Sequence, residues 1–228
     1  MAGCEAAELP VTAAEAPPGR YLYSERYGWF DSQHFYSGDP AQVLEDVRAA
    51  ASNGGGLISI RQSVREGITG HTAHYLVAGH LNEAQVVGVA LGIYMDWSYR
   101  FEAWQGQLPR SLVGPLTAFS VEDLPTHYVG FFAAVRGLEV NEVFDCYLGA
   151  VETTDEAPPH LLLTDDLEAG TLGVPVKHLT NKKFTPMVPT DEGWQNISWP
   201  AGLQLAYIDS SSGLWAFEQE ETWYFNGD

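Results

Sequence analysis

The feature that most constrains the fold of this chain is a long stretch of helical periodicity over residues 82–104. Its apolar residues fall on one broad face: Val86, Val89, Ala90, Ile93, Trp97, Phe101 and Trp104. A helix with so wide an apolar face has to be buried on that side, so we expect it at the centre of the core. Gly88 and Gly92 lower its helix propensity, and they predict that another backbone segment approaches the helix closely.

A shorter helix is predicted over residues 41–51, where apolar residues again recur at helical spacing. Asp39 is placed to cap this helix, and Pro40 suits its first position. The run Asn-Gly-Gly-Gly at residues 53–56 ends it.

Three further helices are expected. One covers residues 69–79, and another covers residues 139–148. Between them, Ser120 followed by Glu122 and Asp123 has the form of a helix start, with a serine cap and acids in the first turn.

Beyond these helices the chain is rich in Pro, Gly, Thr and Trp. Residues 203–208 and 214–217 flank the turn Asp-Ser-Ser-Ser-Gly and predict a β-hairpin. The expected fold class is therefore α+β, a mainly helical core with a small loop-rich β appendage at the C-terminus. We divide the chain into a flexible tail (1–19), a helical core domain (20–150) and a C-terminal extension (151–228) that carries the hairpin and packs on the core.

The chain is strongly acidic, because 30 Asp and Glu against 11 Lys and Arg give a formal charge of -19. The electrostatic field of so negative a surface repels phosphate backbones and anionic lipids. We therefore expect the partner, which is unknown, to be a protein or a small molecule and not a nucleic acid. The longest apolar run, residues 86–95, is about half of what spans a bilayer, so no membrane span is expected. The N-terminus shows no signal-peptide pattern, which predicts a cytoplasmic protein or one exported without a cleavable signal.

The cysteines and lysines give weaker signals. Cys4 and Cys146 do not make a disulfide framework, and the apolar surroundings of Cys146 are typical of packing rather than of a nucleophile. All three lysines, Lys177, Lys182 and Lys183, fall in one short stretch. This stretch is either a solvated turn or a small basic patch for an anion or an acidic partner.

The first candidate site is the stretch Gly-Trp-Phe-Asp-Ser-Gln-His at residues 28–34, which places Asp31 three residues before His34 beside bulky aromatics. A shielded imidazole can bind a metal or act as a general base, and a nearby carboxylate can orient it. The alternative is a structural histidine hydrogen-bonded to its own aspartate.

The second candidate site is the pair His71 and His74, three residues apart on the helix predicted over residues 69–79. Two imidazoles at this spacing can turn toward one ion. The glutamate of the His-Glu-x-x-His metalloprotease motif is absent, as are the phosphate-loop, dinucleotide-binding and Gly-x-Ser-x-Gly signatures.

The third candidate group is a set of carboxylates. Glu102 lies among aromatic residues near the end of the long helix, where desolvation would raise its pKa and suit acid–base chemistry. An exposed or arginine-paired Glu102 is the alternative. Glu122 and Asp123 are also explained as first-turn acids that favour the helix dipole.

Three blocks of the chain, at residues 28–34, 72–76 and 119–130, resemble an uncharacterised bacterial domain family of unknown function. Members of that family carry Gly-Phe-Ile-Asp-x-x-His, a helical Thr-Ala, His-Glu-Ile-Ala-x-Trp-x-Gly and Phe-Ser-x-Glu-Asp-Leu blocks. The resemblance covers roughly residues 28–150, with residues 41–68 as an insertion, and implies a helical domain.

Four positions match the family pattern: Asp31, His34, Glu122 and Asp123. The His-Glu pair of the family falls instead on Tyr99 and Arg100, with Glu102 two residues further on. The resemblance therefore implies a shared site from which this pair has been lost or relocated.

Two functions from different classes are expected. The first is a non-catalytic acidic binding or cargo/effector-type protein of bacterial origin, favoured by the acidity and the missing His-Glu pair. The alternative is a metal-dependent hydrolase that uses a His/carboxylate site, with zinc as the candidate metal. Its candidate metal ligands are His34, His71 and His74. Its candidate catalytic carboxylates are Asp31, Glu102 and Glu122.

Overall fold

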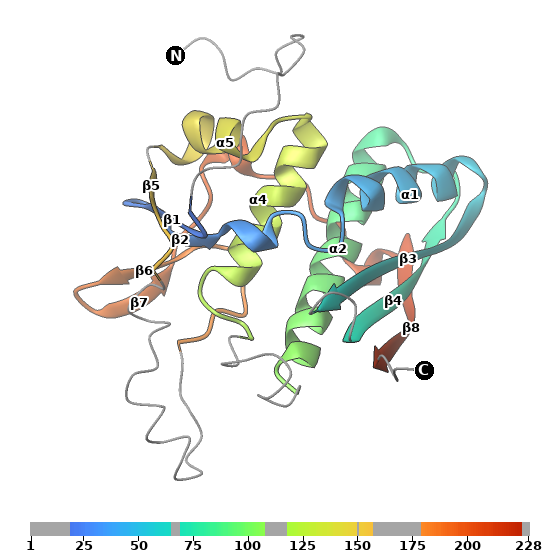
Figure 1. Ribbon diagram of the computed structural model, residues 1–228. Helices are drawn as coiled ribbons and strands as arrows, with labels where there is room; N and C mark the ends of the chain where they lie inside the picture. The colour runs from blue at the N-terminus through green and yellow to red at the C-terminus, as the bar shows by residue number, and fades with distance from the viewer. Residues whose placement is uncertain (1–18, 65–68, 108–117, 150, 157–178, 225–228) are drawn as a thin grey trace.

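The fold contains helices and strands throughout the described chain (Figure 1). This computed structural model describes residues 19–64, 69–107, 118–149, 151–156 and 179–224. Its helices are α1 (Pro40–Ser52), α2 (Glu83–Gln105), α4 (Asp123–Arg136) and α5 (Val140–Val143), with a π-helical turn η2 (Phe144–Leu148) and short 3-10 turns η1 (Ser32–His34), η3 (Ala201–Leu203) and η4 (Ser210–Ser212). Its strands are β1 (Tyr21–Ser24), β2 (Gly28–Asp31), β3 (Gly55–Val64), β4 (Thr69–Ala78), β5 (Val151–Thr154), β6 (Met187–Thr190), β7 (Gly193–Asn196) and β8 (Trp215–Tyr224).

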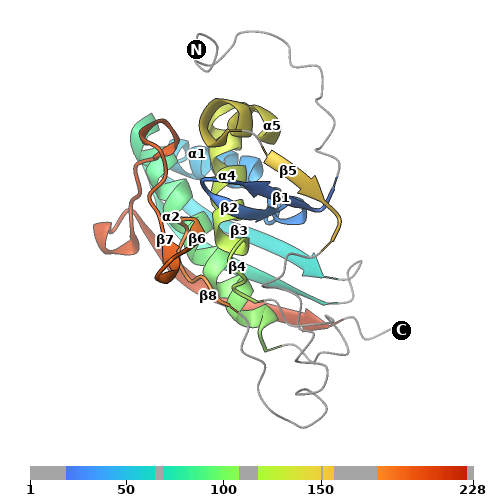
Figure 2. The same ribbon diagram turned by 90° about the vertical axis from the view of Figure 1, so that its left-hand side faces the viewer.

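The strands form three antiparallel sheets in the described part of the chain, with orders β2-β1-β5, β3-β4-β8 and β6-β7. The class is α+β, but the prediction of a mainly helical core with a small C-terminal β appendage is wrong, because four of the eight described strands precede α2. Seen from the side of β1 and β2, β5 runs alongside β1 (Figure 2). Strands from both ends of the sequence therefore share sheets.

The helix predicted over residues 69–79 is wrong, since this segment is β4, the central strand of its sheet. Buried residues alternate along it, and His71, Ala73, Tyr75 and Val77 face the core. Alternation of this kind is the strand period. The spacing of three between His71 and His74 places their side chains on opposite faces of a strand.

The hairpin predicted from residues 203–208 and 214–217 is also wrong. Strand β8 pairs with β4 instead, for example Trp215 with Val77. The preceding segment lies on α2, where the Ile208 N–H donates to the Gly88 carbonyl at 3.1 Å. A Cβ at Gly92 would lie 2.1 Å from the Ile208 carbonyl oxygen, so the predicted close approach of a backbone to these two glycines is confirmed.

The two most strongly patterned helices are confirmed. Helix α1 begins at Pro40, and the Asp39 side chain accepts the Gln42 N–H as expected of a cap. Helix α2 begins after Asn82, which forms a capping box with Gln85. The helix predicted over residues 139–148 is present as α5 and η2. No helix among the described residues is long and apolar enough to cross a membrane, as expected.

Helix α2 separates the β3-β4-β8 sheet from α4 (Figure 1). Aromatic side chains fill the space around it; Tyr94 lies 5.2 Å from Phe131 of α4, centroid to centroid. Helix α4 in turn packs against β2 and η1. The contact is close at Gly130, where a Cβ would lie 1.8 Å from the Phe35 carbonyl oxygen. This contact brings the start of α4 beside His34.

Gly92→Ala tests the close approach of residues 204–209 to α2. The added methyl group would meet a backbone carbonyl, so we expect the free energy of unfolding to fall by about 2 kcal/mol despite the gain in helix propensity. Gly56→Ala is the matched control, because its nearest neighbour would be the Ala50 Cβ at 3.7 Å. Its effect should stay within about 0.5 kcal/mol. Equal denaturation midpoints for the two variants would contradict the described packing.

Candidate functional site

Three potential metal ligands from three separate elements meet beside α2. They are His34 of η1, Glu102 of α2 and His127 of α4, and one ligand atom from each lies within 4.8 Å of the others. Glu102 and His127 are fully buried, while the His34 side chain is 18% exposed. The cluster is therefore covered by protein, and of its three side chains that of His34 is partly exposed.

His34 is held in place through Asp31. The Asp31 carboxylate caps η1 by accepting the Gln33 N–H at 2.9 Å. It also accepts two hydrogen bonds from the Arg20 guanidinium, at 3.1 and 2.8 Å. The Asp31 N–H donates to the Thr126 hydroxyl of α4 at 3.1 Å. These bonds fix η1 against the helix that carries His127.

Two consecutive backbone amides hold two buried carboxylates. The Phe119 N–H donates to Glu102 Oε2 at 3.0 Å, and the Ser120 N–H donates to Asp123 Oδ2 at 2.8 Å. The other oxygen of each carboxylate lies near His34 Nδ1, at 4.0 Å for Glu102 Oε1 and 3.6 Å for Asp123 Oδ1. Phe119 has a φ of 59°, the left-handed region that is strained for a bulky residue.

Burial dominates the electrostatics of the cluster. Desolvation raises the pKa of Glu102, although the charge of His34 opposes this shift. Desolvation and the charge of Glu102 raise the pKa of Asp123 well above its usual range. Desolvation, with a smaller effect of His34, lowers the pKa of His127 well below that of a free imidazole. Without a metal, burial thus favours the neutral forms of Glu102, Asp123 and His127. A bound cation would favour the ionised forms of the two carboxylates.

Several polar atoms of the cluster are buried without a hydrogen-bond partner. They are His34 Nδ1, Glu102 Oε1 and both ring nitrogens of His127. The His34 and His127 rings stack with centroids 5.2 Å apart. Nearly all buried polar atoms of native proteins are hydrogen-bonded, and a bound ion or water is one way in which convergent unpaired atoms are satisfied.

Two predicted site residues lie beside the cluster rather than in it. Asp31 and Glu122 are both buried, but Asp31 is engaged by Arg20, and Glu122 is the first flanking residue of α4. Helix α4 begins at Asp123, with Glu122 rather than Ser120 as the residue before it, and the Ser120 N–H donates to the Asp123 side chain. The acids in this turn therefore orient a backbone segment as well as favouring the helix dipole.

His71 and His74 do not join the cluster. His71 Nε2 lies 3.5 Å from the Glu220 carboxylate, and desolvation lowers the pKa of His71. His74 faces the other side of the sheet, with Nδ1 2.7 Å from the Ser59 hydroxyl. The predicted pairing of these histidines on one metal depended on the helix that β4 replaces.

His127 was not among the predicted site residues. It stands four residues after Asp123, so the two share one face of α4. That spacing was the only local signal for it.

Cys146 takes no part in the cluster. It lines a pocket of about 390 Å³ together with residues of the β1–β2 turn and η2, and it carries no free thiol. Cys146 is instead disulfide-bonded, which was not predicted from the sequence. Cys4 lies outside the described residues.

Comparisons of this chain with known protein families, with curated proteins and with solved structures find no match. The roles of the cluster residues are accordingly inferred from their contacts and chemistry.

Asp123→Asn tests the electrostatics of the metal-free cluster. Because folding raises the pKa of Asp123, the folded protein retains a proton that the unfolded chain releases, and stability is lost as pH rises above the ordinary range of an aspartate. In the presence of a chelator we expect Asp123→Asn to increase the free energy of unfolding by about 1–3 kcal/mol at pH 8, and by less at pH 4.5.

The matched control for this prediction is the exposed Asp145, whose replacement by Asn should leave the stability unchanged at both pH values. The free energy of unfolding of each variant is measured by denaturant titration and compared with that of the unsubstituted protein. The histidines are the same in all of these proteins, so a difference reports on the substituted aspartate. A destabilised Asp123→Asn protein at pH 8 would contradict the described burial.

Proposed function

We propose that this protein is a metal-dependent hydrolase whose single divalent cation, zinc first, is held by His34, Glu102 and His127. The observation that carries the proposal is the convergence of one potential ligand atom from each of these three residues within 4.8 Å, in a cluster that contains buried polar atoms without a hydrogen-bond partner. Two imidazoles and one glutamate are the ligand set of a class of catalytic zinc sites that keep a fourth position for water.

The separation of the ligand atoms fits this role. Ligands bound tetrahedrally about 2.1 Å from zinc lie about 3.4 Å from one another. His34 Nδ1 and Glu102 Oε1 are 4.0 Å apart without a metal. Small side-chain rotations would bring these atoms to bonding positions, because the backbone around them is already fixed by Asp31 and Phe119.

Asp123 is the carboxylate placed to act as general base. Its Oδ2 is fixed by the Ser120 N–H, and its Oδ1 lies 3.6 Å from the proposed ligand atom of His34. A carboxylate beside the open coordination position can remove a proton from the attacking water and later pass it to the leaving group. In this proposal Glu102 is a ligand rather than a base, and Glu122 takes no direct part.

The resemblance to the uncharacterised bacterial family is compatible with the proposal. Of the four matching positions, His34 and Asp123 line the cluster and Asp31 holds His34 in place. Glu102, which follows the position of the missing His-Glu pair, supplies the carboxylate ligand. We therefore propose that this chain keeps a metal site in which Glu102 provides the ligand lost from that pair.

Elemental analysis of protein purified without a His tag tests the ligand set. We expect about one zinc per chain, lost in His34→Ala, His127→Ala and Glu102→Gln. His74→Ala is the matched control, since His74 is a partly buried histidine outside the cluster, and it should keep the metal. Zinc retained in His127→Ala would refute the assignment. Iron in place of zinc would overturn the choice of zinc but keep the ligand set, since two imidazoles and one carboxylate also bind iron.

No metal in the unsubstituted protein, even after incubation with zinc, would leave the non-catalytic binding protein as the remaining hypothesis. Capture of a partner would then be the informative experiment.

Activity of the zinc-loaded protein tests the role of Asp123. A panel of chromogenic esters and fluorogenic peptides identifies a substrate that the chelator-treated protein does not hydrolyse. On that substrate we expect Asp123→Asn to keep its zinc and to lose about 10²–10⁴-fold in kcat, the usual contribution of a general base. An unchanged kcat in this variant would show that Asp123 is not the general base.

A further inference from the structure

The turn that holds the two carboxylates is itself held from the C-terminal part of the chain. Residues 118–123 lead into α4, and their backbone supplies the two amides that bind Glu102 and Asp123. An isolated bridge joins Ser120 to Thr180. The residue after Thr180, Asn181, makes two hydrogen bonds to this turn.

Asn181 is 1% exposed, and all of its hydrogen-bonding groups toward the turn are used. Its N–H donates to the Phe119 carbonyl at 2.8 Å, and its side-chain Nδ2 donates to the Val121 carbonyl at 3.3 Å. Nδ2 also donates to the Thr185 carbonyl at 3.0 Å. Asn181 thus binds the turn through the residues before and after Ser120.

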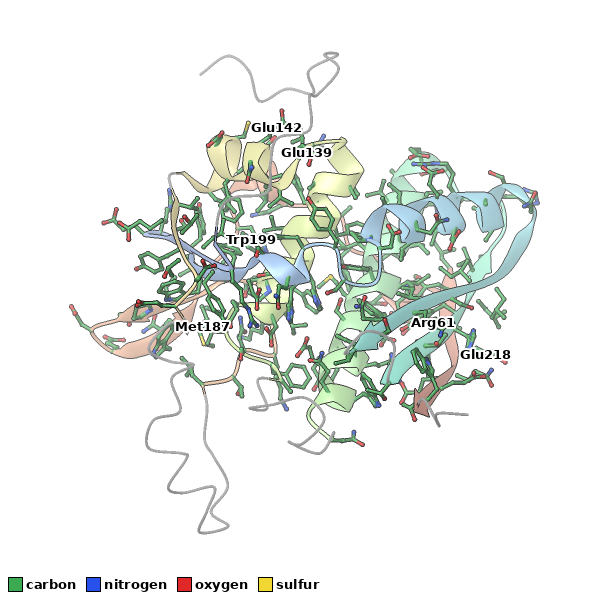
Figure 3. The ribbon with its side chains drawn as sticks, in the orientation of Figure 1. Arg61, Glu139, Glu142, Met187, Trp199 and Glu218 are labelled. Atoms are coloured by element: carbon green, nitrogen blue, oxygen red, sulfur yellow. The ribbon has the colours of Figure 1, made fainter. Side chains whose placement is uncertain are left out.

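The acceptor oxygen of Asn181 is occupied as well. Oδ1 accepts the Lys183 N–H at 3.0 Å and an N–H of the Asn196 side chain at 3.1 Å. Asn196 ends β7, so the β6–β7 hairpin fixes the orientation of the Asn181 amide. Met187 of this hairpin and Trp199 lie on the side of α4 away from the β3-β4-β8 sheet (Figure 3).

We infer that Asn181 is a positioning residue of the metal site, an inference that rests on the proposed function. The left-handed Phe119 cannot keep its strained conformation without external restraint, and Asn181 provides it by binding the carbonyls of Phe119 and Val121. If this restraint is lost, the two amides move and the carboxylates lose their orientation. Groups that orient metal ligands in this way contribute about 10- to 100-fold to metal affinity.

This role differs from both sequence interpretations of the lysine-rich stretch. Lys182 and Lys183 are exposed, as a solvated turn requires, but Asn181 between Thr180 and Lys182 is buried. Lys177 lies outside the described residues. The stretch therefore contributes a buried amide to the site, next to two exposed lysines.

Titration of the full-length metal-free protein with Co²⁺ tests the inference, because cobalt occupies zinc sites and its visible absorption reports the coordination geometry. We expect the Kd of Asn181→Ala for Co²⁺ to rise about 10- to 100-fold, with an altered absorption spectrum at saturation. Ser24→Ala is the matched control, since Ser24 is also 1% exposed and donates to a distant carbonyl, that of Leu148. Its Kd should stay within about twofold.

A second variant keeps the test decisive if Asn181→Ala does not fold. Asn196→Ala leaves Asn181 in place and removes the bond to its Oδ1 together with the Asn196 bonds to the Thr185 and Pro186 carbonyls. We expect about a three- to tenfold rise in the Kd. If Asn181→Ala folds and keeps the wild-type affinity and spectrum, the inference is overturned. If only Asn196→Ala folds, the same result in that variant overturns it. An equal loss of affinity in Ser24→Ala would also overturn it. An unsubstituted protein that fails to bind Co²⁺ would instead overturn the proposed function and this inference with it.

Discussion

The burial of α2 is the constraint on which the rest of the structure depends. Its apolar surface is too wide for one neighbour, and the described chain covers it with α1, the β3-β4-β8 sheet, α4 and the segment around Ile208. Glu102 lies in the last turns of this helix and is carried into the interior with it. A buried carboxylate is unfavourable unless its charge is compensated or lost. His34 lies 4.0 Å from Glu102, and desolvation raises the pKa of Glu102 toward its neutral form.

Local sequence signals were sufficient to predict helices α1 and α2, because each has apolar residues at helical spacing and a capping side chain. They failed for β4, where a short apolar segment fits either period, and for β8, whose partner strand lies far away in the sequence. In the site, His34 and Glu102 were identifiable from their neighbours. His127 was not, because its meaning depends on the close packing of Gly130 against Phe35, which no local pattern encodes.

The distribution of charge over the molecule is uneven in a way that composition does not reveal. The formal charge is -19, and most carboxylates of the described residues are at least partly exposed, where solvent and salt screen their mutual repulsion. Four carboxylates are nevertheless buried near one another, those of Asp31, Glu102, Glu122 and Asp123. Arg20 compensates part of this charge through Asp31. The backbone amides of Phe119 and Ser120 donate to Glu102 and Asp123, and His34 lies within 4.0 Å of both carboxylates.

The cluster draws on widely separated parts of the chain, since His34, Glu102 and His127 belong to different elements and the turn beside them is fastened by Asn181. Short fragments of this chain contain at most part of the ligand set. During synthesis the turn beside the site gains this restraint only after the residues around Asn196 have been made and the β6–β7 hairpin has closed. A metal held at full affinity would therefore report that segments far apart in the sequence have all folded.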